Sequence, residues 1–425
     1  MSSTPPPLTT AEVARRLGVK PATVYAYVSR GLLRSQRNAD GKASLFAEAD
    51  VEAFASQRHR TTHREDAPTI HTGITLIRNG RLSYRGHDTC ALALSHSYES
   101  VVTLLWTGTL EHLDIEPSSE LLTLAQAVTA PLPSSARLTD RLRVIVAAAA
   151  AADPLRFDTT PTAVITTGRT MLATMVAALP VRSTRQPEDA PLRTHPTTAD
   201  ALWRRLTTAA PTPQGLTALN AALVLLADHD IAASTLAARV AASTRAHPYA
   251  VVGAGLAAQD GPLHGAASGL AHALLTDAAR SANPVGTISE RLRVGGTIPG
   301  FGHPLYSSGD PRARTLLTLL PDAPGKQHAR KTIDALVTTM SSRSGNAPNI
   351  DFALAALALL TDMGPDAGEA IFAVARTAGW IAHALEEYDD RPSRFRPSGR
   401  YGGPPPPECR RQVEADADAM KVGRM

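Results

Sequence analysis

The chain has 425 residues, of which 43% are hydrophobic and 19% are charged. This length and balance allow two or three domains with a sizeable core, and they exclude a disordered, coiled-coil or collagen-like protein. No stretch approaches the roughly 18 uncharged apolar residues of a spanning helix, and the N-terminus is polar and proline-rich, so we expect neither a membrane span nor a secretory signal. The two cysteines, Cys90 and Cys409, cannot build a disulfide scaffold or a thiolate zinc site. These features predict a cytoplasmic protein.

Positive charge is concentrated near the N-terminus. Residues 11–64 contain ten Lys or Arg and five Asp or Glu, a balance of +5, whereas the whole chain carries +4. One short basic segment therefore precedes a near-neutral body. Such asymmetry indicates a nucleic-acid-binding module, and on charge alone a solvated basic surface explains it about equally well.

The basic segment predicts two helices with a tight turn between them. Residues 9–12, Thr-Thr-Ala-Glu, have the form of a capping box, in which side chains satisfy free helix amides. Gly18 can end this first helix. Pro21 suits the first position of a second helix, which Gly31 stops. Helix, glycine-containing turn, helix is the pattern of a helix-turn-helix.

A hairpin and a third helix complete this domain. Asp40-Gly41 is a hairpin turn signal, and residues 48–58 predict a helix that buries Val51 and Phe54. Residues 8–60 resemble the winged helix-turn-helix of the MerR and excisionase type, and we assign residues 1–62 to this domain. The alternative to DNA contact is a retained structural appendage. If the domain binds DNA, the side chains that could face the major groove are Lys20, Thr23, Tyr27 and Arg30. The side chains that could contact phosphates are Arg34, Arg37 and Lys42.

From about Thr69 onward the sequence is rich in Ala, Leu and Thr, and its apolar residues recur mostly at helical spacing. Strand candidates are scarce, and the best one is residues 72–84, interrupted by Asn79-Gly80. Residues 185–200 predict an exposed loop. The body is therefore expected to be all-α.

One motif resembles a nucleotide-binding fingerprint, and no metal-binding motif is found. Residues 253–258 imitate the dinucleotide fingerprint G-x-G-x-x-A, but that fingerprint needs a preceding strand inside a βαβ unit. Close helix packing explains these glycines better. The 14 histidines contain no H-E-x-x-H arrangement, so a metal site is not expected either.

Residues 261–268, Gly-Pro-Leu-His-Gly-Ala-Ala-Ser, place a histidine just before a predicted helix that runs through Leu275. Free backbone N–H groups and the helix dipole at that point disfavour an extra positive charge. His264 is therefore expected to stay neutral and to be able to donate a hydrogen bond to a developing oxyanion. A helix-capping histidine is the alternative.

A glycine-rich segment follows, with four glycines between residues 295 and 302. Glycines let the backbone approach a ligand closely and present amides to it, although the Walker pattern of nucleotide-binding loops is absent. Just beyond, His303 offers a hydrogen-bond donor and Arg312 a fixed cation for a carboxylate. A surface glycine loop is the alternative.

Two charged residues occur in apolar helical segments. Asp351 lies in the first turn of one of them. An acid at this position is ordinarily a partner of the helix dipole, and the same position would keep a catalytic carboxylate ionised and able to accept a proton. Arg376 is the only fixed charge in residues 370–385, in line with Phe372 and Trp380. Because burying an unpaired cation is costly, Arg376 must meet an anion from the protein or from a ligand.

Taken in this order, the segments resemble the citrate synthase family over residues 69–404. A single match would be weak evidence, whereas this many matches in register are strong. The matching motifs are Tyr84-Arg85-Gly86-His87, Trp106-Thr107-Gly108, Asp228 to Thr235, Gly261 to Gly265, Pro299 to His303, Asp310-Pro311-Arg312, Asn349-Ile350-Asp351, Ala375 to Trp380, Arg396-Pro397 and Tyr401-Gly402.

The resemblance implies condensation of an acyl-CoA with a 2-oxo acid such as oxaloacetate, followed by thioester hydrolysis that releases CoA. It implies Asp351 as the base that removes a proton beside the thioester carbonyl, His264 as the donor to the enol oxygen, and His303 as the donor to the keto group. The residues implied to bind the dicarboxylate are His229, Arg312, Arg376 and, across subunits, Arg396; those implied to line the CoA side are Gly296, Ile298, Gly300 and Gly302.

The resemblance also implies two helical domains that close over the substrates. The large domain would comprise residues 69–265 and 351–405, the small domain residues 266–350, and residues 406–425 a tail. If Arg396 acts across subunits, the enzyme is a homodimer. Acyl-CoA would enter as a substrate, and no cofactor is implied.

Two positions near His229 depart from the family pattern, because Ala232 stands where the family usually has Asn and Asp230 where it has Glu. The lost amide donor leaves the identity of the oxo acid open. We predict a citrate synthase-like enzyme that uses acetyl-CoA and oxaloacetate. One alternative is a 2-methylcitrate synthase that uses propionyl-CoA, and another is a DNA-binding regulator that uses the synthase body as a metabolite sensor.

Overall fold

The computed structural model describes residues 7–17, 19–29, 33–37, 44–48, 50–52, 54, 69–182, 196–342 and 346–398. Contacts between Cα atoms divide the chain into two units, Met1–His71 and Thr72–Met425, and each unit is described by itself. Several sequence predictions fall outside the described residues, namely those for Gly18, Arg30, Gly31, Asp40-Gly41, Lys42, Cys409 and most of the loop at 185–200.

The first unit is the predicted helix-turn-helix. Its elements are β1 (Leu8–Thr9), α1 (Thr10–Arg16), α2 (Pro21–Ser29), β2 (Gln36–Arg37) and β3 (Ser44–Phe46), and residues 48, 50–52 and 54 are helical. The strands pair antiparallel in the order β1-β3-β2. The Thr9 and Glu12 side chains each accept a hydrogen bond from the other residue's amide, so the predicted capping box is present.

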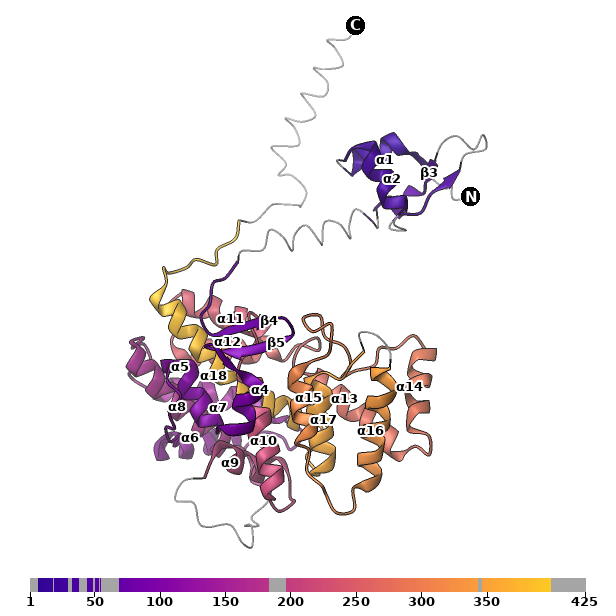
Figure 1. Cartoon of the computed structure of the whole chain (residues 1–425). Coiled ribbons are helices and arrows are strands. Elements are labelled where there is room, and N and C mark those ends of the chain that lie inside the picture. Colours follow the sequence, from indigo (N-terminus) through magenta and orange to yellow (C-terminus); the bar gives the residue numbers. More distant parts are fainter. Residues whose placement is uncertain are drawn as a thin grey trace. The chain divides into compact units, whose positions relative to one another are not determined.

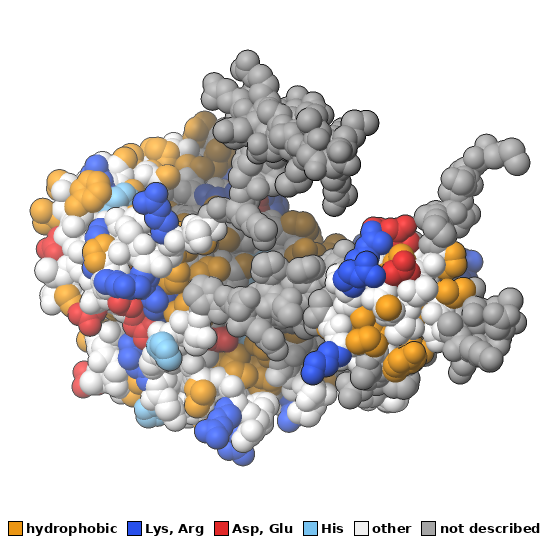
Figure 2. All heavy atoms as spheres, turned by 90° about the horizontal axis from the view of Figure 1, so that it is seen from above, with side chains coloured by type: hydrophobic (Ala, Val, Ile, Leu, Met, Phe, Trp, Pro, Cys, Tyr) orange, Lys and Arg blue, Asp and Glu red, His pale blue; other side chains and the backbone are white. Residues whose placement is uncertain are grey.

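The second unit consists of helices and one small sheet (Figure 1). Charged side chains are scattered among uncharged ones on the face that Figure 2 shows. No described helix combines the length and the apolar character needed to cross a membrane. The elements are β4 (Thr75–Arg78), β5 (Arg81–Tyr84), β6 (His87–Asp88), α4 (Thr89–Ser95), α5 (Tyr98–Thr107), α6 (Ser119–Thr129), α7 (Leu138–Ala152), α8 (Pro161–Ala177), α9 (Thr198–Leu206), α10 (Pro213–Leu226), α11 (Ala233–Ser243), α12 (Pro248–Gln259), α13 (Ala267–Arg280), α14 (Pro284–Arg293), α15 (Pro311–Thr318), α16 (Gln327–Ser341), α17 (Ile350–Leu360) and α18 (Ala367–Asp389).

The strand candidate at residues 72–84 forms a hairpin. Strands β4 and β5 pair antiparallel, with Thr75 opposite Tyr84. Asn79 (φ 54°) and Gly80 (φ 72°) make the turn, because these two residue types tolerate positive φ. β6 joins as the third strand, in the order β4-β5-β6. This sheet is a small addition to a mostly helical body, so the predicted helical fold is confirmed.

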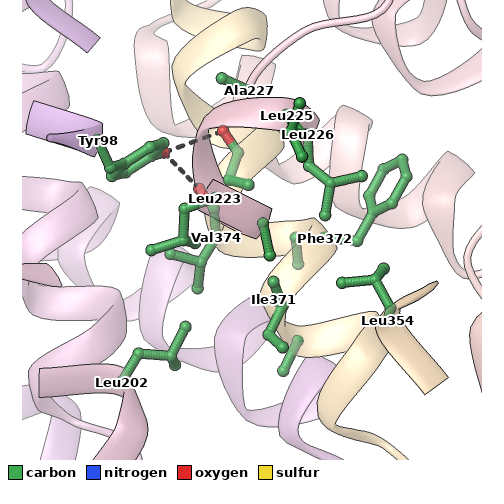
Figure 3. Packing of buried hydrophobic residues seen from close by; sticks show 14 of the residues in the cluster. Tyr98, Leu202, Leu223, Leu225, Leu226, Ala227, Leu354, Ile371, Phe372 and Val374 are labelled. Carbon is green, nitrogen blue, oxygen red and sulfur yellow. Dashed lines mark hydrogen bonds between the residues drawn. The ribbon is translucent and has the colours of Figure 1, made fainter. Parts of the chain in front are cut away.

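Helix α18 is the central helix of the body. It packs against α5, α8, α10, α11 and α12, and nearly all its residues from 367 to 384 are buried. Figure 3 shows apolar side chains of α18 among leucines of α9, α10 and α17. Its many alanines and glycines keep the helix narrow, so its neighbours can approach closely on every side.

The glycines of α12 illustrate this close approach. A Cβ on Gly255 would lie 2.5 Å from the ring of Trp380 in α18. Residues 253–258 lie inside α12 and have no strand before them. The sequence prediction that these glycines serve helix packing is therefore confirmed for Gly255, whereas a Cβ on Gly253 would meet nothing within 4 Å.

Helices α13 to α17 form a second group, drawn in orange in Figure 1. Within it α13 packs against α14, α16 and α17, and α15 packs against α17. α13 begins at Ala267 and α17 at Ile350. The division into large and small domains at 265/266 and 350/351 stays a prediction.

Candidate active site

A main-chain hydrogen bond holds the start of the loop between α10 and α11 against α18, and the Tyr98 side chain of α5 holds α18 itself. The Tyr98 hydroxyl donates to two carbonyl oxygens of α18, one of them that of Ala375 at 2.9 Å (Figure 3). The Gly379 amide donates to the Ala227 carbonyl oxygen at 3.0 Å. A Cβ on Gly379 would lie 2.5 Å from that oxygen, so only glycine fits here. Ala227, which directly precedes Asp228 and His229, is thereby fixed beside α18.

Arg376 lies on the same stretch of α18 and is 1% exposed. Its Nε donates to the Leu226 carbonyl oxygen at 2.8 Å, and its guanidinium lies 4.5 Å from the centre of the Phe372 ring. Its Nη1 is buried and has no hydrogen-bond partner among the described residues, nor does Arg376 form an ion pair with any of them. Burial lowers the pKa of this guanidinium. A ligand carboxylate would satisfy it.

Asp228 is fully buried in a polar network beneath the loop. Its carboxylate accepts a hydrogen bond from the Thr75 hydroxyl at 2.5 Å and lies 3.3 Å from His383 Nε2. The Tyr84 hydroxyl donates to its main-chain oxygen at 2.8 Å. Burial acts to raise the pKa of Asp228, but His383 and Arg376 hold it below its ordinary value. Asp228 is therefore a buried negative charge that interacts electrostatically with Arg376.

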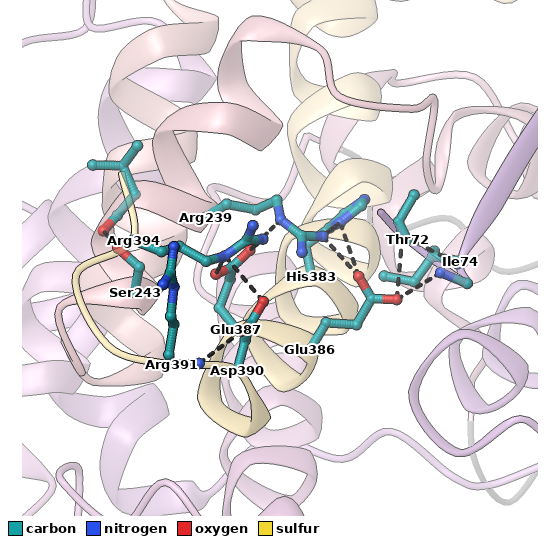
Figure 4. A network of polar contacts seen from close by, with 12 residues as sticks. Thr72, Ile74, Arg239, Ser243, His383, Glu386, Glu387, Asp390, Arg391 and Arg394 are labelled. Carbon is teal, nitrogen blue, oxygen red and sulfur yellow. Dashed lines mark hydrogen bonds and ion pairs between the residues drawn. The ribbon is translucent and has the colours of Figure 1, made fainter. Parts of the chain in front are cut away.

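His383 extends this network to the end of α18 (Figure 4). Arg239 donates to His383 Nδ1 at 2.5 Å and forms ion pairs with Glu386 and Glu387. Glu387 also pairs with Arg394 at 2.5 Å. The sequence analysis missed this network, and its one signal is that Arg239 is the only charge in α11.

The segment after α18 carries Arg396. The Ser393 amide donates to the Ser243 carbonyl oxygen at 2.7 Å, and the Arg394 guanidinium lies 4.4 Å from the centre of the Phe395 ring. These contacts hold the segment close to α11 and α18. Arg396 itself is exposed in this chain, and its action across subunits stays a prediction.

His264 lies in the turn before α13, with its ring centre 5.5 Å from that of Phe372. Its Nε2 is 2.8 Å from the buried Ser234 hydroxyl. That hydroxyl has no other partner among the described residues, so it donates to Nε2 and leaves the ring proton on Nδ1. Burial and Arg376 lower the pKa of His264 to about 4. The ring is therefore neutral, and burial, followed by Arg376, is the cause.

His303 and Arg312 lie on the segment that leads into α15. The Leu305 amide donates to His303 Nδ1 at 3.1 Å, and Arg312 Nη2, which can only donate, lies 3.5 Å from Nε2, so a donor faces each ring nitrogen. Burial and Arg312 lower the pKa of His303. Arg312 is 2% exposed and makes a bidentate ion pair with Asp310. The sequence analysis predicted Arg312 to be a fixed cation for a carboxylate, and Asp310 already pairs with part of its guanidinium.

His229 faces His303 from the loop between α10 and α11. The two ring centres are 5.3 Å apart, and the Tyr306 hydroxyl is 2.9 Å from His229 Nε2. Burial, followed by Arg312 and Arg376, holds the pKa of His229 well below its ordinary value. His229 is therefore neutral.

The three imidazoles share one feature. Each has a lowered pKa and at least one ring nitrogen next to a protein hydrogen-bond donor. For His264 and His229 the proton of the neutral ring is therefore on the other nitrogen. Arg376 depresses the pKa of both His264 and His229, and His229 touches His303. The structure thus brings these predicted residues into one region, together with Arg312.

Asp351 lies in the first turn of α17, behind the N-cap residue Asn349. The Asn349 side chain accepts from the Asp351 amide at 3.1 Å and donates to the Gly302 carbonyl oxygen at 3.0 Å, which ties Asp351 to the segment of His303. Burial raises the pKa of Asp351 to about 6, against a smaller lowering by Arg312. Burial thus outweighs the helix dipole that the sequence analysis invoked. No described residue donates a hydrogen bond to the carboxylate, so it can accept a proton.

The glycine-rich segment depends on glycine for its own shape. Gly300 has φ +87°, and a Cβ there would lie 2.8 Å from that of Phe352. Gly302 has φ +80°, and a Cβ on Gly296 would meet a backbone oxygen at 3.1 Å. Ile298 packs against the core of the second unit. The predicted contacts of this segment with CoA stay a prediction.

The helix-turn-helix residues predicted to face DNA divide into two kinds. Lys20 is exposed and Thr23 is half-buried on α2 or just before it. The Tyr27 ring, in contrast, lies 5.0 Å from the Phe54 ring in the small core of this unit. Tyr27 is thus half-buried against this core, and its contact with DNA stays a prediction. Tyr25, also on α2, is 55% exposed.

Comparison with known proteins identifies the class of this fold. The helical body is that of a citrate synthase-type transferase. The family model described as "Citrate synthase, C-terminal domain" matches residues 64–398, and one described as "Helix-turn-helix domain" matches residues 7–59. The chain belongs to the citrate synthase family.

Three similar proteins illustrate the range of the family. A citrate synthase of Haloferax volcanii is 32% identical over 76% of this chain and 90% of its own length. A 2-methylcitrate synthase of Corynebacterium glutamicum is 26% identical over 76% of this chain and 89% of its own length. The citrate synthase of Thermoplasma acidophilum, solved with carboxymethyl coenzyme A and oxaloacetate, shares the fold with a TM-score of 0.65 at 23% identity, covering 81% of this chain and 97% of that one.

Proposed function

We propose that this protein condenses acetyl-CoA with oxaloacetate to give citrate and CoA. The observation that carries the proposal is the buried Arg376 guanidinium, which has no carboxylate partner among the described residues and lies beside the neutral His229 and His264. A cation and neutral N–H donors in one buried place suit an anionic oxo acid whose carbonyl is to be attacked. The kinship with citrate synthases supports this substrate class.

In this mechanism Asp351 removes a proton from the methyl group of the thioester, and His264 donates its N–H to the enol oxygen that forms. The methyl carbon attacks the keto carbon of oxaloacetate, and His303 gives its ring proton to the alkoxide. The proton taken up by Asp351 then restores His303, so that both residues return to their starting forms. Water then breaks the C–S bond, so that the acyl carbon gains a hydroxyl and CoA leaves as a thiol. Each acid or base is worth about 10²–10⁴ in rate, and the enol donor on the order of 3 kcal/mol.

The remaining residues of the proposal bind the two substrates. A dicarboxylate needs at least two cations, and the free part of the Arg312 guanidinium and Arg376 are available in this chain. Closure of residues 266–350 over the site would exclude water until condensation is complete. The full proposed set is His229, Arg312, Arg376 and Arg396 of the partner subunit for oxaloacetate, and Gly296, Ile298, Gly300 and Gly302 for CoA.

The test is release of CoA thiol by the full-length protein with and without oxaloacetate. We expect release from acetyl-CoA that depends on oxaloacetate, with a smaller kcat/KM for propionyl-CoA, because one methylene shifts discrimination by about 1–3 kcal/mol. A preference for propionyl-CoA would support the alternative of a 2-methylcitrate synthase, which the Corynebacterium glutamicum relative favours. No release from either thioester would overturn the proposal.

A homodimer is part of this proposal, and an uncharged helical face supports it. α11 packs against α12, and α12 packs against α7. α12 contains no charged residue, and the one charge of α11, Arg239, is buried. Leu236 and Val240 on α11 are 41% and 39% exposed. An apolar face that spans neighbouring helices suits a second copy of the chain, whose C-terminal segment would bring Arg396 of the partner subunit.

Replacing Leu236 with arginine is expected to separate the dimer, because the new charge would be buried against the partner without a counter-ion. Sedimentation of the wild type should give twice the 44.8 kDa chain mass, and that of the variant the mass of one chain. Leu94→Arg, at an exposed leucine on α4, is the control and should stay dimeric. A monomeric wild type, or a Leu236→Arg variant that remains dimeric, would contradict this.

The first unit supports a second function, DNA binding. Lys20 and Arg34 are exposed beside α2, and their charges suit phosphates. Anisotropy of a labelled duplex should show binding by the full-length protein that weakens with salt. Lys20→Ala and Arg34→Ala should each reduce the salt slope by about 1, and Arg293→Ala, an exposed arginine on α14, should not. No binding at low salt would leave this unit as a structural appendage.

A further inference from the structure

Tyr306 lies among the residues proposed to hold the oxo acid, although the sequence analysis did not single it out. It is 3% exposed. Its hydroxyl is 2.9 Å from His229 Nε2, and its ring centre lies 4.8 Å from that of His303 and 5.7 Å from the guanidinium carbon of Arg312. One side chain therefore contacts three of the proposed binding residues.

The backbone around Tyr306 is fixed by a tight turn. Its amide donates to the His303 carbonyl oxygen at 3.2 Å, and its carbonyl oxygen accepts from the Gly309 amide at 3.1 Å. The ring packs beside both the His303 ring and the Arg312 guanidinium. Tyr306 thus connects the segment before α15 with His229, which lies on the loop between α10 and α11.

The Tyr306 hydroxyl determines which nitrogen of His229 carries the proton. A buried phenol needs an acceptor for its O–H, and among the described residues His229 Nε2 is the one hydrogen-bond partner of this hydroxyl. Tyr306 therefore donates, Nε2 accepts, and the proton of the neutral ring is on Nδ1. A hydrogen bond to the backbone of His229 also acts on this ring, and without the Tyr306 hydroxyl the ring would lose the partner of Nε2.

We propose that Tyr306 is a positioning residue for the oxo acid: it holds His229 in one tautomer and orientation beside His303 and Arg312. This inference rests on the proposed function and extends it, because it assigns the affinity for the oxo acid, but not for acyl-CoA, to a residue outside the predicted set. Tyr306 acts through His229 and takes no part in moving the proton of the thioester.

The experiment compares Tyr306→Phe with the wild type, because phenylalanine keeps the ring contacts and removes only the hydroxyl. We expect the KM and the calorimetric dissociation constant for oxaloacetate to rise about tenfold, the ratio that a hydrogen bond of ordinary strength supplies. The kcat and the KM for acetyl-CoA should stay close to wild type. Tyr388→Phe is the matched control, because its hydroxyl donates to the Ala246 carbonyl oxygen at 2.6 Å outside the site.

A double-mutant cycle with His229→Ala separates positioning from simple packing. If Tyr306 acts through His229, the Phe substitution should raise the oxaloacetate KM in the wild-type background and have little further effect in His229→Ala. Unchanged oxaloacetate binding in Tyr306→Phe, or a full and additive effect in the His229→Ala background, would overturn the inference alone. A wild type that neither binds nor turns over oxaloacetate would overturn the proposed function, and the inference with it.

Discussion

Replacing Asp351 with asparagine is expected to lower the kcat of oxaloacetate-dependent thiol release by about 10²–10⁴, the usual worth of a positioned base. Asparagine has nearly the same shape and cannot take the proton. The N-cap contact from Asn349 uses the backbone amide of residue 351, so α17 should keep its start. Because the proposed cations are untouched, the dissociation constant for oxaloacetate should change little, and calorimetry together with steady-state kinetics checks both expectations.

The matched control is Asp334→Asn, at an exposed carboxylate on α16 that should not affect turnover.

Wild-type kcat/KM should also fall about tenfold per pH unit as the pH drops below the Asp351 pKa of about 6, because the base must be ionised to accept a proton. His264, with a pKa of about 4, stays neutral through this range. Turnover by Asp351→Asn at the wild-type rate, or a flat pH profile through that range, would contradict the assigned base.

Replacing Gly379 with alanine is expected to damage both stability and oxaloacetate binding. Alanine normally favours a helix by about 1 kcal/mol over glycine. Here the added Cβ would lie 2.5 Å from the Ala227 carbonyl oxygen and 2.5 Å from Asp228 Oδ1, so backbone and a buried carboxylate would have to move. Such overpacking costs about 1–3 kcal/mol or more, and displacement of the loop that carries His229 should lower kcat/KM on the order of 10².

Thermal unfolding and kinetics of Gly379→Ala test this, with an expected loss of about 5 °C in Tm. Gly269→Ala in α13 is the control, because a Cβ there would come no closer than 3.3 Å, to the flexible end of the Glu369 side chain. Wild-type stability and activity in Gly379→Ala would show that the loop tolerates the extra atom. This result would contradict the claim that close packing against α18 fixes the loop that carries His229.

The elements that were predictable from the sequence have local signals. The capping box at Thr9 and the Asn79-Gly80 turn are set by neighbouring residues, and both are present. The buried cation at Arg376 was predictable from physics alone, because one charge in a long apolar helix must be buried. The catalytic His264, His303 and Asp351, in contrast, were found through family motifs, since neither spacing nor composition says that they meet.

The contacts that could not be predicted join distant parts of the chain. Arg239 and His383 are separated by 144 positions, and Asp228 and His383 by 155. Their pairing depends on how α11 and α18 pack, which no local pattern specifies. Tyr306 was missed for the same reason, because its partner His229 comes from another loop.

The direct test of the central claim is identification of the product. Full-length protein would be incubated with acetyl-CoA labelled in its methyl group and with oxaloacetate, and the products measured by mass spectrometry. The account predicts citrate that contains the label, in an amount equal to the thiol released, and loss of both in Asp351→Asn. Thiol release without labelled citrate, or citrate formation at the wild-type rate in the variant, would contradict it.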